Sequence, residues 1–288
     1  MPELPEVETI ARGVHERLRG DRIEAAWFSK KPEPFKSPPQ VMARELAGRR
    51  IDRVFRVGKH IVFDLADSPV VKSLATKALQ GQELQWVVHL GMTGRLLVAD
   101  PDTPVPAHTQ AILHLASGRE LRFVDPRRFG RLELHGSSKQ TSPLKRFEGS
   151  GKEPLSISPD EFAALFKPRR TSIKAALLNQ KLLHGVGNIY ADESLFRAGI
   201  RPRRMARHLK RAEFDRLHAS LQSVLKEAIS LGGSSVSDYV DADGVEGFFQ
   251  LEHRVYLRTK LPCLVCETPI RRILLAGRGT HYCPNCQR

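Results

Sequence analysis

The segments CLVC at residues 263–266 and CPNC at residues 283–286 hold all four cysteines of the chain, in the spacing C-x2-C-x16-C-x2-C. Each segment can present two thiolates from one short turn, and a hairpin between the turns brings the two pairs together. Four thiolates so arranged are the ligands of a tetrahedral zinc ion. The spacing therefore predicts a zinc ribbon in which Cys263, Cys266, Cys283 and Cys286 bind one structural Zn2+.

Two disulfides are the alternative use of these cysteines. A chain of 288 residues can bury a hydrophobic core without such cross-links. Its N-terminus has none of the features of a signal peptide, so an oxidising compartment is not indicated. We therefore expect bound zinc and a cytoplasmic location.

The chain is strongly basic. It has 46 Lys and Arg against 32 Asp and Glu, a formal net charge of +14, and it contains no apolar run of membrane-spanning length. A field of this sign attracts phosphate backbones. Many basic chains are merely soluble, and a zinc ribbon alone is usually a structural hairpin. The combination of a strong positive charge with a zinc ribbon favours a nucleic acid as the partner and argues against a membrane.

The N-terminal half is expected to be a helix followed by a β-domain. Pro5 suits an early helix position, and Val7, Ile10, Val14 and Leu18 recur on one face. From residue 22 to about residue 134 the pattern changes to short β-like runs that are broken by Gly, Pro and Asp. These runs cover residues 53–65, 86–90, 111–115 and 120–124. The pattern predicts a β-sandwich or barrel behind an N-terminal helix.

The C-terminal half is expected to be helical up to the ribbon. Residues 136–159 carry Ser, Gly, Lys and Pro without periodicity and are typical of a linker. Helices are predicted over residues 171–181, 188–198 and 211–230, and the last has an apolar stripe from Phe214 to Ala228. A long loop over residues 234–249 then leads into the ribbon. The fold class is therefore α+β with several domains.

The N-terminus is the first candidate for chemistry. Removal of Met1 leaves Pro2 with a free secondary amine, and an α-amino group with a pKa near 8 is partly unprotonated at neutral pH. Such an amine that attacks a sugar C1′ forms an iminium ion, which acidifies the C2′ proton. Glu3 and Glu6 are nearby carboxyl groups for proton transfer. Taken alone, the Pro-Glu pattern is ordinary chemistry for a helix start.

Several further motifs accompany it in order along the whole chain. Together they closely resemble the bacterial formamidopyrimidine-DNA glycosylases. The motifs are PELPEVET at 2–9, VGKH at 57–60, HLGM at 89–92, DPRRFG at 125–130, GVGNIY at 185–190 and the ribbon. The resemblance implies a bifunctional base-excision repair enzyme of the bacterial cytoplasm and nucleoid. It would excise oxidised purines, chiefly 8-oxoguanine and formamidopyrimidines, from double-stranded DNA and cleave the strand by β,δ-elimination, acting as a monomer.

The resemblance also implies a domain plan. Residues 1–135 would form a catalytic β-sandwich domain and residues 136–159 a linker. Residues 160–249 would form a helix-two-turn-helix domain with a lesion-capping loop, and residues 250–288 the zinc ribbon. The capping loop is matched by residues 234–239. An insertion over residues 68–79, just before His89, departs from the family pattern; a basic excursion toward DNA and an inert surface loop both remain open.

The catalytic roles follow from the resemblance. Pro2 would be the nucleophile, Glu3 the acid or base beside the sugar, and Glu6 would position water or the flipped nucleotide. Lys59, on a β-like run, matches a lysine that contacts phosphate around the lesion. Its simpler interpretation is a solvated strand charge.

The DNA-binding roles follow in the same way. His89 matches another phosphate contact, although a lone histidine before a Gly turn is ordinarily structural. Asn188 opens a helix after a Gly-Val-Gly turn, where it is a candidate N-cap beside free N–H groups that favour a phosphate. Arg278, at the tip of the ribbon, matches an arginine that binds phosphate.

Met92, Arg127 and Phe129 match the family residues that fill the gap left by a flipped nucleotide. A flexible thioether, a planar cation and a ring that wedges between base pairs suit that task. Core packing is the simpler interpretation of Met92 and Phe129.

Two rival functions remain. An endonuclease VIII-like enzyme has the same fold and nucleophile but acts on oxidised pyrimidines; Leu4 and the gap-filling set favour the purine enzyme. A zinc-ribbon DNA-binding protein without activity is the other rival. The intact set of Pro2, Glu3, Glu6 and Lys59 argues against it.

Overall fold

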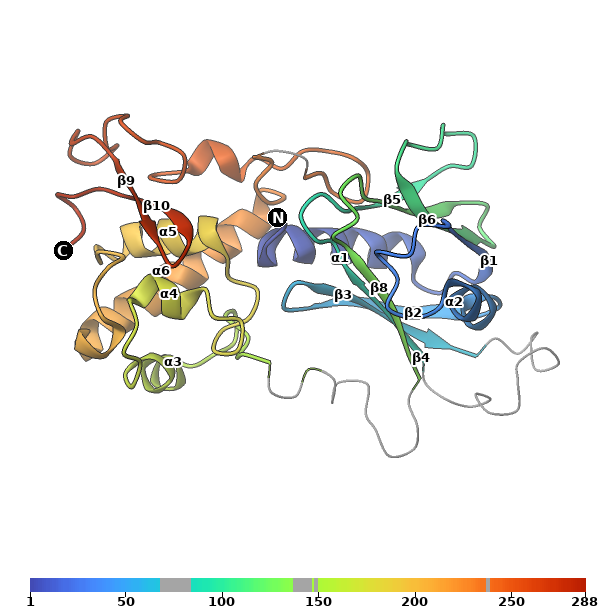
Figure 1. Ribbon diagram of the computed structural model, residues 1–288, viewed down its shortest axis with the longest axis horizontal. Coiled ribbons are helices and arrows are strands. Elements are labelled where there is room, and N and C mark those ends of the chain that lie inside the picture. The colour runs from blue at the N-terminus through green and yellow to red at the C-terminus, as the bar shows by residue number, and fades with distance from the viewer. Residues whose placement is uncertain (68–83, 137–146, 148–149, 237–238) are drawn as a thin grey trace. The chain divides into compact units, whose positions relative to one another are not determined.

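The computed structural model describes residues 1–67, 84–136, 147, 150–236 and 239–288 (Figure 1). The chain forms two compact units. The first, here called the sheet unit, comprises Met1–Pro2, Glu6–Glu148 and Ser234–Gly247; the second, the helical unit, comprises Glu3–Pro5, Gly149–Gly233 and Phe248–Arg288. The insertion at residues 68–79 lies outside the described residues. The boundaries between the four predicted segments stay predictions.

The sheet unit contains two four-stranded antiparallel sheets and, from Glu6 onward, helix α1 (Leu4–Leu18). The first sheet has the order β1-β6-β7-β5 and the second β2-β3-β4-β8. The strands are β1 (Ile23–Phe28), β2 (Arg50–Val57), β3 (His60–Ala66), β4 (Leu84–His89), β5 (Arg95–Ala99), β6 (Thr109–Leu115), β7 (Glu120–Val124) and β8 (Arg131–Gly136). The predicted β-sandwich behind an N-terminal helix is confirmed.

One core joins α1 to both sheets. The predicted apolar face of α1 is buried, with Val7, Ile10, Val14 and Leu18 at most 1% exposed. These side chains share a cluster with Phe63 and Trp86 of one sheet and with Leu113 and Phe123 of the other. Burial of aliphatic and aromatic side chains at this density is the main stabilising term for such a sandwich.

Two predictions for this unit were wrong in detail. Residues 53–65 are two strands, β2 and β3, joined by a tight turn at Gly58 and Lys59. Lys59 therefore lies in a turn and not on a strand. Helix α2 (Pro39–Leu46) was not predicted; Pro39 occupies its first turn, where the missing N–H costs no hydrogen bond.

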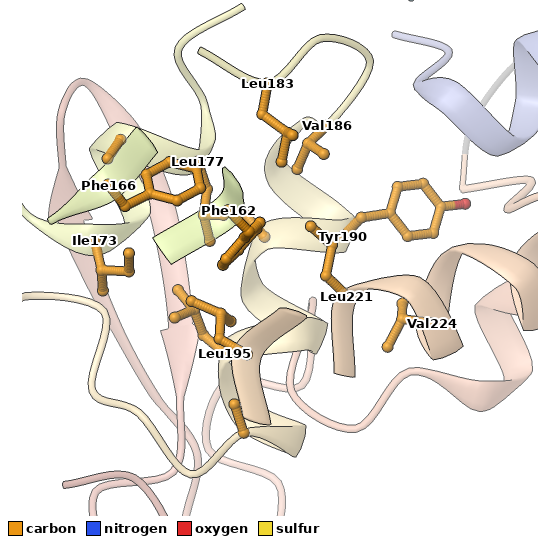
Figure 2. Packing of buried hydrophobic residues seen from close by; sticks show 14 of the residues in the cluster. Phe162, Phe166, Ile173, Leu177, Leu183, Val186, Tyr190, Leu195, Leu221 and Val224 are labelled. Atoms are coloured by element: carbon orange, nitrogen blue, oxygen red, sulfur yellow. The ribbon is translucent and has the colours of Figure 1, made fainter. Parts of the chain in front are cut away.

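From residue 150 onward, the described residues of the helical unit form four α-helices, two 3-10 segments and the hairpin of the ribbon. These elements are α3 (Pro159–Phe166), α4 (Ile173–Leu177), α5 (Asn188–Arg197), η3 (Ala206–His208), α6 (Arg211–Ser230), η4 (Phe249–Glu252), β9 (Arg271–Leu275) and β10 (Arg278–Tyr282). Figure 2 shows the core, in which Phe162 and Phe166 of α3 and Tyr190 of α5 pack with Leu221 and Val224 of α6. The predicted apolar stripe of α6 is buried as expected.

The helix predicted over residues 171–181 is much shorter, because α4 spans only Ile173–Leu177. Helix α3 was missed, although its N-terminus has a capping box between Ser158 and Glu161 that the sequence displays as Ser-x-x-Glu. Within the described part of the chain, no helix combines the length and apolarity needed to cross a membrane.

Candidate functional site

Glu3 is fixed at the N-terminus of α5. Its side chain is buried, and its carboxylate accepts hydrogen bonds from the amide of Ile189 at 3.1 Å and from that of Tyr190 at 3.5 Å. A side chain at Gly187 would overlap this carboxyl group. The Gly-Val-Gly turn therefore makes room for Glu3, and the positive end of the α5 dipole faces a negative charge.

This arrangement corrects the expectation for Asn188. The N-cap of α5 is Gly187, and Asn188 is the first residue of the helix. The amides of Ile189 and Tyr190 at this helix start donate to Glu3. The side chain of Asn188 instead donates from Nδ2 to the carbonyl oxygen of Gly279, at 2.9 Å.

Glu6 is held by the segment that follows α6. Its side chain is 2% exposed, and Oε1 accepts a hydrogen bond of 2.8 Å from the amide of Ser234. Tyr239 lies against the same stretch, and burial together with the negative charge of Glu6 raises the pKa of its phenol. Residues 237–238 of the predicted capping loop lie outside the described residues. Glu6 is thus a buried carboxylate, bonded to the start of that loop.

Lys59 and His89 belong to one cluster of basic residues at an end of the second sheet. His89 pairs with His60 on one side and with Arg131 on the other. Burial, followed by the charges of His60, Arg131 and Lys59, lowers the pKa of His89 to about 3. Its Nδ1 accepts the amide hydrogen of Gly91 at 3.1 Å, so the ring is neutral near pH 7 and offers Nε2–H as a donor.

The turns that carry Met92, Arg127 and Phe129 pack directly on each other. Gly91 has a φ of +65°, and a Cβ there would lie 2.5 Å from the carbonyl carbon of Phe129, so the contact requires glycine. Met92 is 42% and Phe129 55% exposed. The Arg127 guanidinium lies 4.7 Å from the centre of the Phe129 ring. Core packing of Met92 and Phe129 is thereby excluded.

A buried aspartate holds these two turns together. Asp125 is 0% exposed. Its Oδ1 accepts from the Thr93 hydroxyl and its Oδ2 from the amide of Gly130, both at 2.7 Å. Asp125 belongs to the DPRRFG motif, but the sequence alone does not indicate its role.

The four cysteines form the predicted metal centre. Their Sγ atoms all lie within 4.8 Å of one another, and three of the pairs are 3.3, 3.4 and 3.9 Å apart. A zinc–sulfur distance of about 2.3 Å places tetrahedral thiolates about 3.8 Å apart. The thiolates thus fit one zinc ion and are too far apart for disulfide bonds. Four protein ligands leave no open position, so the zinc is structural.

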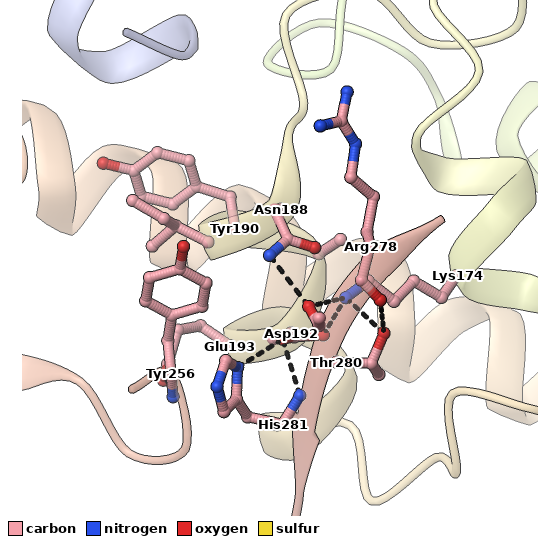
Figure 3. Close-up of polar contacts among 12 residues, drawn as sticks. Lys174, Asn188, Tyr190, Asp192, Glu193, Tyr256, Arg278, Thr280 and His281 are labelled. Carbon is pink, nitrogen blue, oxygen red and sulfur yellow. Dashed lines mark hydrogen bonds and ion pairs between the residues drawn. The ribbon is translucent and has the colours of Figure 1, made fainter. Parts of the chain in front are cut away.

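The ribbon hairpin presents Arg278 at its tip. Strands β9 and β10 are joined by Ala276 and Gly277, and Leu275 pairs with Arg278. Arg278 is exposed, and Figure 3 shows its side chain extending away from the buried contacts below it. His281 directs its backbone amide and Nδ1 to Asp192 and lies outside the cysteine cluster.

Three buried charged residues of the helical unit were not identified from the sequence. Lys174 and Asp192 are both 0% exposed and form an ion pair of 2.7 Å. Glu193 is also 0% exposed, and its carboxylate accepts the amides of Arg254, Val255 and Tyr256. The available signal was their position: each lies on a short helix among apolar neighbours, where a charge needs a partner.

A β-sandwich with exposed cationic and aromatic turn residues, together with a helical unit that carries a closed zinc ribbon, defines a nucleic-acid-binding protein of the zinc-ribbon class. Residues 1–132 match the model of the formamidopyrimidine-DNA glycosylase N-terminal domain. Residues 151–240 match that family's H2TH domain, and residues 260–288 match a zinc finger found in FPG and IleRS.

Curated relatives match over the whole chain. A formamidopyrimidine-DNA glycosylase of Solibacter usitatus is 45% identical over 288 residues, which is 100% of each protein. One of Listeria monocytogenes is 38% identical and also covers 100% of both. A solved structure of wild-type Lactococcus lactis Fpg with DNA that contains N7-benzyl-Fapy-dG has a TM-score of 0.86 at 33% identity and 100% coverage of both chains. This chain belongs to the formamidopyrimidine-DNA glycosylase family.

Proposed function

We propose that this chain is a bifunctional DNA glycosylase that excises oxidised purines from duplex DNA and then cleaves the strand by β,δ-elimination. Its family membership over the full length supports the glycosylase activity. The Lactococcus relative was crystallised with DNA that contains N7-benzyl-Fapy-dG. It was also crystallised with DNA that contains an abasic site, in a structure with a TM-score of 0.86 and 32% identity. An oxidised purine and an abasic site are the substrates of the two successive steps.

Pro2 is the proposed nucleophile. After Met1 is removed, its amine attacks C1′ and the bond from C1′ to the base breaks, with the electron pair leaving on the base. The amine gives up its proton, the C1′–O4′ bond of the sugar ring breaks with O4′ taking up a proton, and the nitrogen lone pair forms the C1′=N+ bond of an iminium. This iminium accepts the electrons released when the C2′ proton is removed, and the 3′ phosphate leaves. A second elimination releases the 5′ phosphate. The chemistry needs an amine that is unprotonated at neutral pH, which an α-amino group supplies.

The position of Glu3 is the observation that carries this proposal. The residue after Pro2 has a buried carboxylate held by two backbone amides at the start of α5. A carboxylate that is fixed in this way next to Pro2 supports the proposed role of Glu3 in proton transfer to the sugar or the base. Glu6, which is fixed by Ser234, is proposed to position water or the flipped nucleotide.

The remaining residues are proposed to hold DNA. Lys59 and the neutral donor His89, which lie in one basic cluster, would contact phosphates around the lesion. Asn188 and Arg278 would do so from the helical unit. The exposed set of Met92, Arg127 and Phe129 would fill the gap in the duplex, because its thioether, cation and ring lie on two turns that contact each other.

Oxidised pyrimidines are the second candidate substrate. A further structure of the Lactococcus relative, with a TM-score of 0.85 and 32% identity, holds DNA that contains an oxidised pyrimidine. We infer that the purine activity is the larger one. Single-turnover rates on matched duplexes with 8-oxoguanine or an oxidised pyrimidine will rank the two, and a faster pyrimidine reaction contradicts the assignment.

Borohydride trapping tests the nucleophile. Borohydride added during turnover should reduce the iminium and join the protein to DNA through the peptide that begins at Pro2. Pro2→Gly keeps a primary amine and some activity, whereas an N-terminal tag should abolish both trapping and cleavage. Lys59→Ala is the matched control and should still form the adduct. An adduct on Lys59, or normal cleavage by the tagged protein, contradicts the mechanism.

We also propose that the enzyme acts as a monomer in the bacterial cytoplasm, associated with the nucleoid through DNA. The charge of +14 supports this association with an anionic polymer. Sedimentation of the protein with one duplex should give a complex of one chain. A complex of two chains per duplex contradicts the monomer.

A further inference from the structure

We propose that Lys174 and Asp192 are positioning residues for Arg278: their buried ion pair fixes strand β10 so that the arginine at the ribbon tip points at DNA phosphate. This inference rests on the proposed function, in which Arg278 contacts phosphate. It assigns a role to a buried cluster that lies outside the catalytic groups and outside the zinc ligands.

Lys174 makes its contacts to the segment that follows Arg278. Its Nζ is 2.7 Å from Asp192 Oδ1, and it donates to Thr280 Oγ1 at 2.8 Å and to the carbonyl oxygen of Gly279 at 3.2 Å. The ammonium group thus makes one ion pair and two hydrogen bonds. The Thr280 hydroxyl in turn donates to the carbonyl oxygen of Arg278 at 3.2 Å. Lys174 thus reaches the backbone of Arg278 through one hydroxyl group.

Asp192 holds the same strand from helix α5. Its Oδ2 accepts the amide of His281 at 2.8 Å, while its Oδ1 faces Lys174. Asn188, one turn earlier on α5, donates to Gly279 O. Three successive residues of β10, from Gly279 to His281, are therefore bonded to side chains of α4 and α5 (Figure 3).

Neither member of the pair can itself reach DNA. Lys174 and Asp192 are 0% exposed, whereas Arg278 is exposed and its side chain extends away from them (Figure 3). Burial lowers the pKa of Lys174, and the adjacent Asp192 charge opposes that shift. A buried ion pair contributes little net stability compared with an apolar pair of the same size. What it does supply is directional contacts, and these end on the backbone beside Arg278.

The neighbouring Glu193 acts on a different part of the ribbon. Its carboxylate binds the amides of residues 254–256, before the first cysteine pair. The zinc fixes the base of the hairpin. The contacts of Lys174 and Asp192 are distinct because they lie within three residues of Arg278.

A double-mutant cycle on the zinc-loaded, full-length protein tests the inference. The first variant is Arg278→Ala. The second carries Lys174→Met together with Asp192→Asn, which replaces the ion pair by two uncharged side chains and is called the neutral pair. The third carries all three changes. Affinity is measured for a duplex with a tetrahydrofuran abasic analogue, which cannot be cleaved, across a range of salt concentrations. This readout does not depend on Pro2 or Glu3, so a failure of the proposed chemistry leaves it intact.

Arg278→Ala and the neutral pair should each weaken binding about tenfold, as expected for one charge-assisted contact. Each should lower the slope of log affinity against log salt by about 0.9. Adding Arg278→Ala to the neutral pair should then change the affinity by less than about twofold, because the contact is already lost. Lys167→Met is the matched control: its Nζ also donates to a backbone carbonyl, that of Leu209, far from β10 in sequence, and its affinity should be unchanged.

Three results overturn the inference. The first is that the losses of affinity caused by the neutral pair and by Arg278→Ala are additive. The second is that the protein with the neutral pair no longer binds zinc. The third is that Lys167→Met weakens DNA binding as much as the neutral pair does. Additive losses mean that the pair does not act through Arg278, and zinc loss means that it maintains the ribbon fold. A wild-type chain without affinity for the damaged duplex contradicts the proposed function itself, and with it this inference.

Discussion

Two aspartates, one in each unit, are fully buried beneath the exposed residues that are proposed to contact DNA. Asp125 lies under the turns that present Met92 and Phe129, and Asp192 lies under the hairpin that presents Arg278. Asp125 is bonded by a hydroxyl and a backbone amide. Asp192 is bonded by a backbone amide and faces the ammonium group of Lys174.

The two carboxylates differ in where the groups that stabilise them come from. The donors of Asp125 come from its own two turns, so the arrangement is local and complete once the turns form. Asp192 depends on a lysine from another helix, and loss of that lysine leaves a buried charge without its counter-ion, which is the costly case for a buried ion pair. We therefore expect the sheet unit to present its DNA-contacting residues independently, whereas the hairpin of the ribbon depends on the helices beneath it.

Removal of zinc should have the largest effect and should be confined to the helical unit. Cys283→Ser removes one ligand from a closed site and should release the metal, because about 10 kcal/mol of binding free energy is coupled to folding of such a module. Metal analysis should find one zinc per wild-type chain and none in the variant. Hydrogen exchange should increase across residues 260–288 while the sheet unit keeps its protection. Equal loss of protection in the sheet unit contradicts the independence argued above.

Lys174→Met should cost the next largest amount, about 3–5 kcal/mol in the free energy of unfolding, because the charge of Asp192 is left buried and unpaired. Adding Asp192→Asn should recover most of this loss, since the buried charge is then absent. Urea titrations of both variants measure the two values. A single variant that is no less stable than the double variant contradicts the ion-pair interpretation.

The sequence predicted the parts of the fold that have a strong period. The apolar stripe of α6 and the face of α1 were predicted because their burial follows a helical repeat over fifteen residues or more. The elements α2 and α3 were missed because each has eight residues, too few for a repeat to stand out. Helix α4 was predicted too long, because Leu178 continues the apolar run of the helix although it is the C-cap and is only half-buried.

Some residues of the candidate site were likewise predicted from the sequence, and others were missed. The cysteine cluster was predicted because its spacing alone specifies the geometry. The assigned roles of Pro2, Glu3 and the gap-filling residues came from a family resemblance and stay predictions. Asp125, Lys174 and Asp192 were missed because their partners are distant in the chain, 32 residues away for Thr93 and about 90 for His281. A single sequence without tertiary contacts gives no sign of such pairs.

Asp125→Ala should have a smaller effect, about 2 kcal/mol, because it leaves one hydroxyl and one amide without a partner but no charge. It should also slow removal of a paired base more than cleavage at a pre-formed abasic site, since the turns of Met92 and Phe129 lose their common support. Phe129→Ala should show the same selectivity without the loss of stability. Equal slowing on both substrates means that Asp125 only supports the fold.

The smallest effect is a dependence of stability on pH that distinguishes the two units. In the sheet unit the pKa of His89 is lowered to about 3 by burial and then by His60, Arg131 and Lys59; in the helical unit burial and then His281 lower the pKa of His253 to about 4. As the pH falls below the usual value of 6.5, the unfolded chain binds protons that the folded chain does not, so the free energy of unfolding decreases.

Between pH 7 and pH 5.5 each of these histidines should remove about 1 kcal/mol of stability. His89→Gln, which stays neutral, should reduce the decrease by that amount, and His253→Gln should do the same for the helical unit. Urea titrations at both pH values measure the effect. A decrease in His89→Gln as large as in the wild type would mean that His89 titrates alike in the folded and unfolded chains, and would remove the basis for treating it as a neutral donor to phosphate.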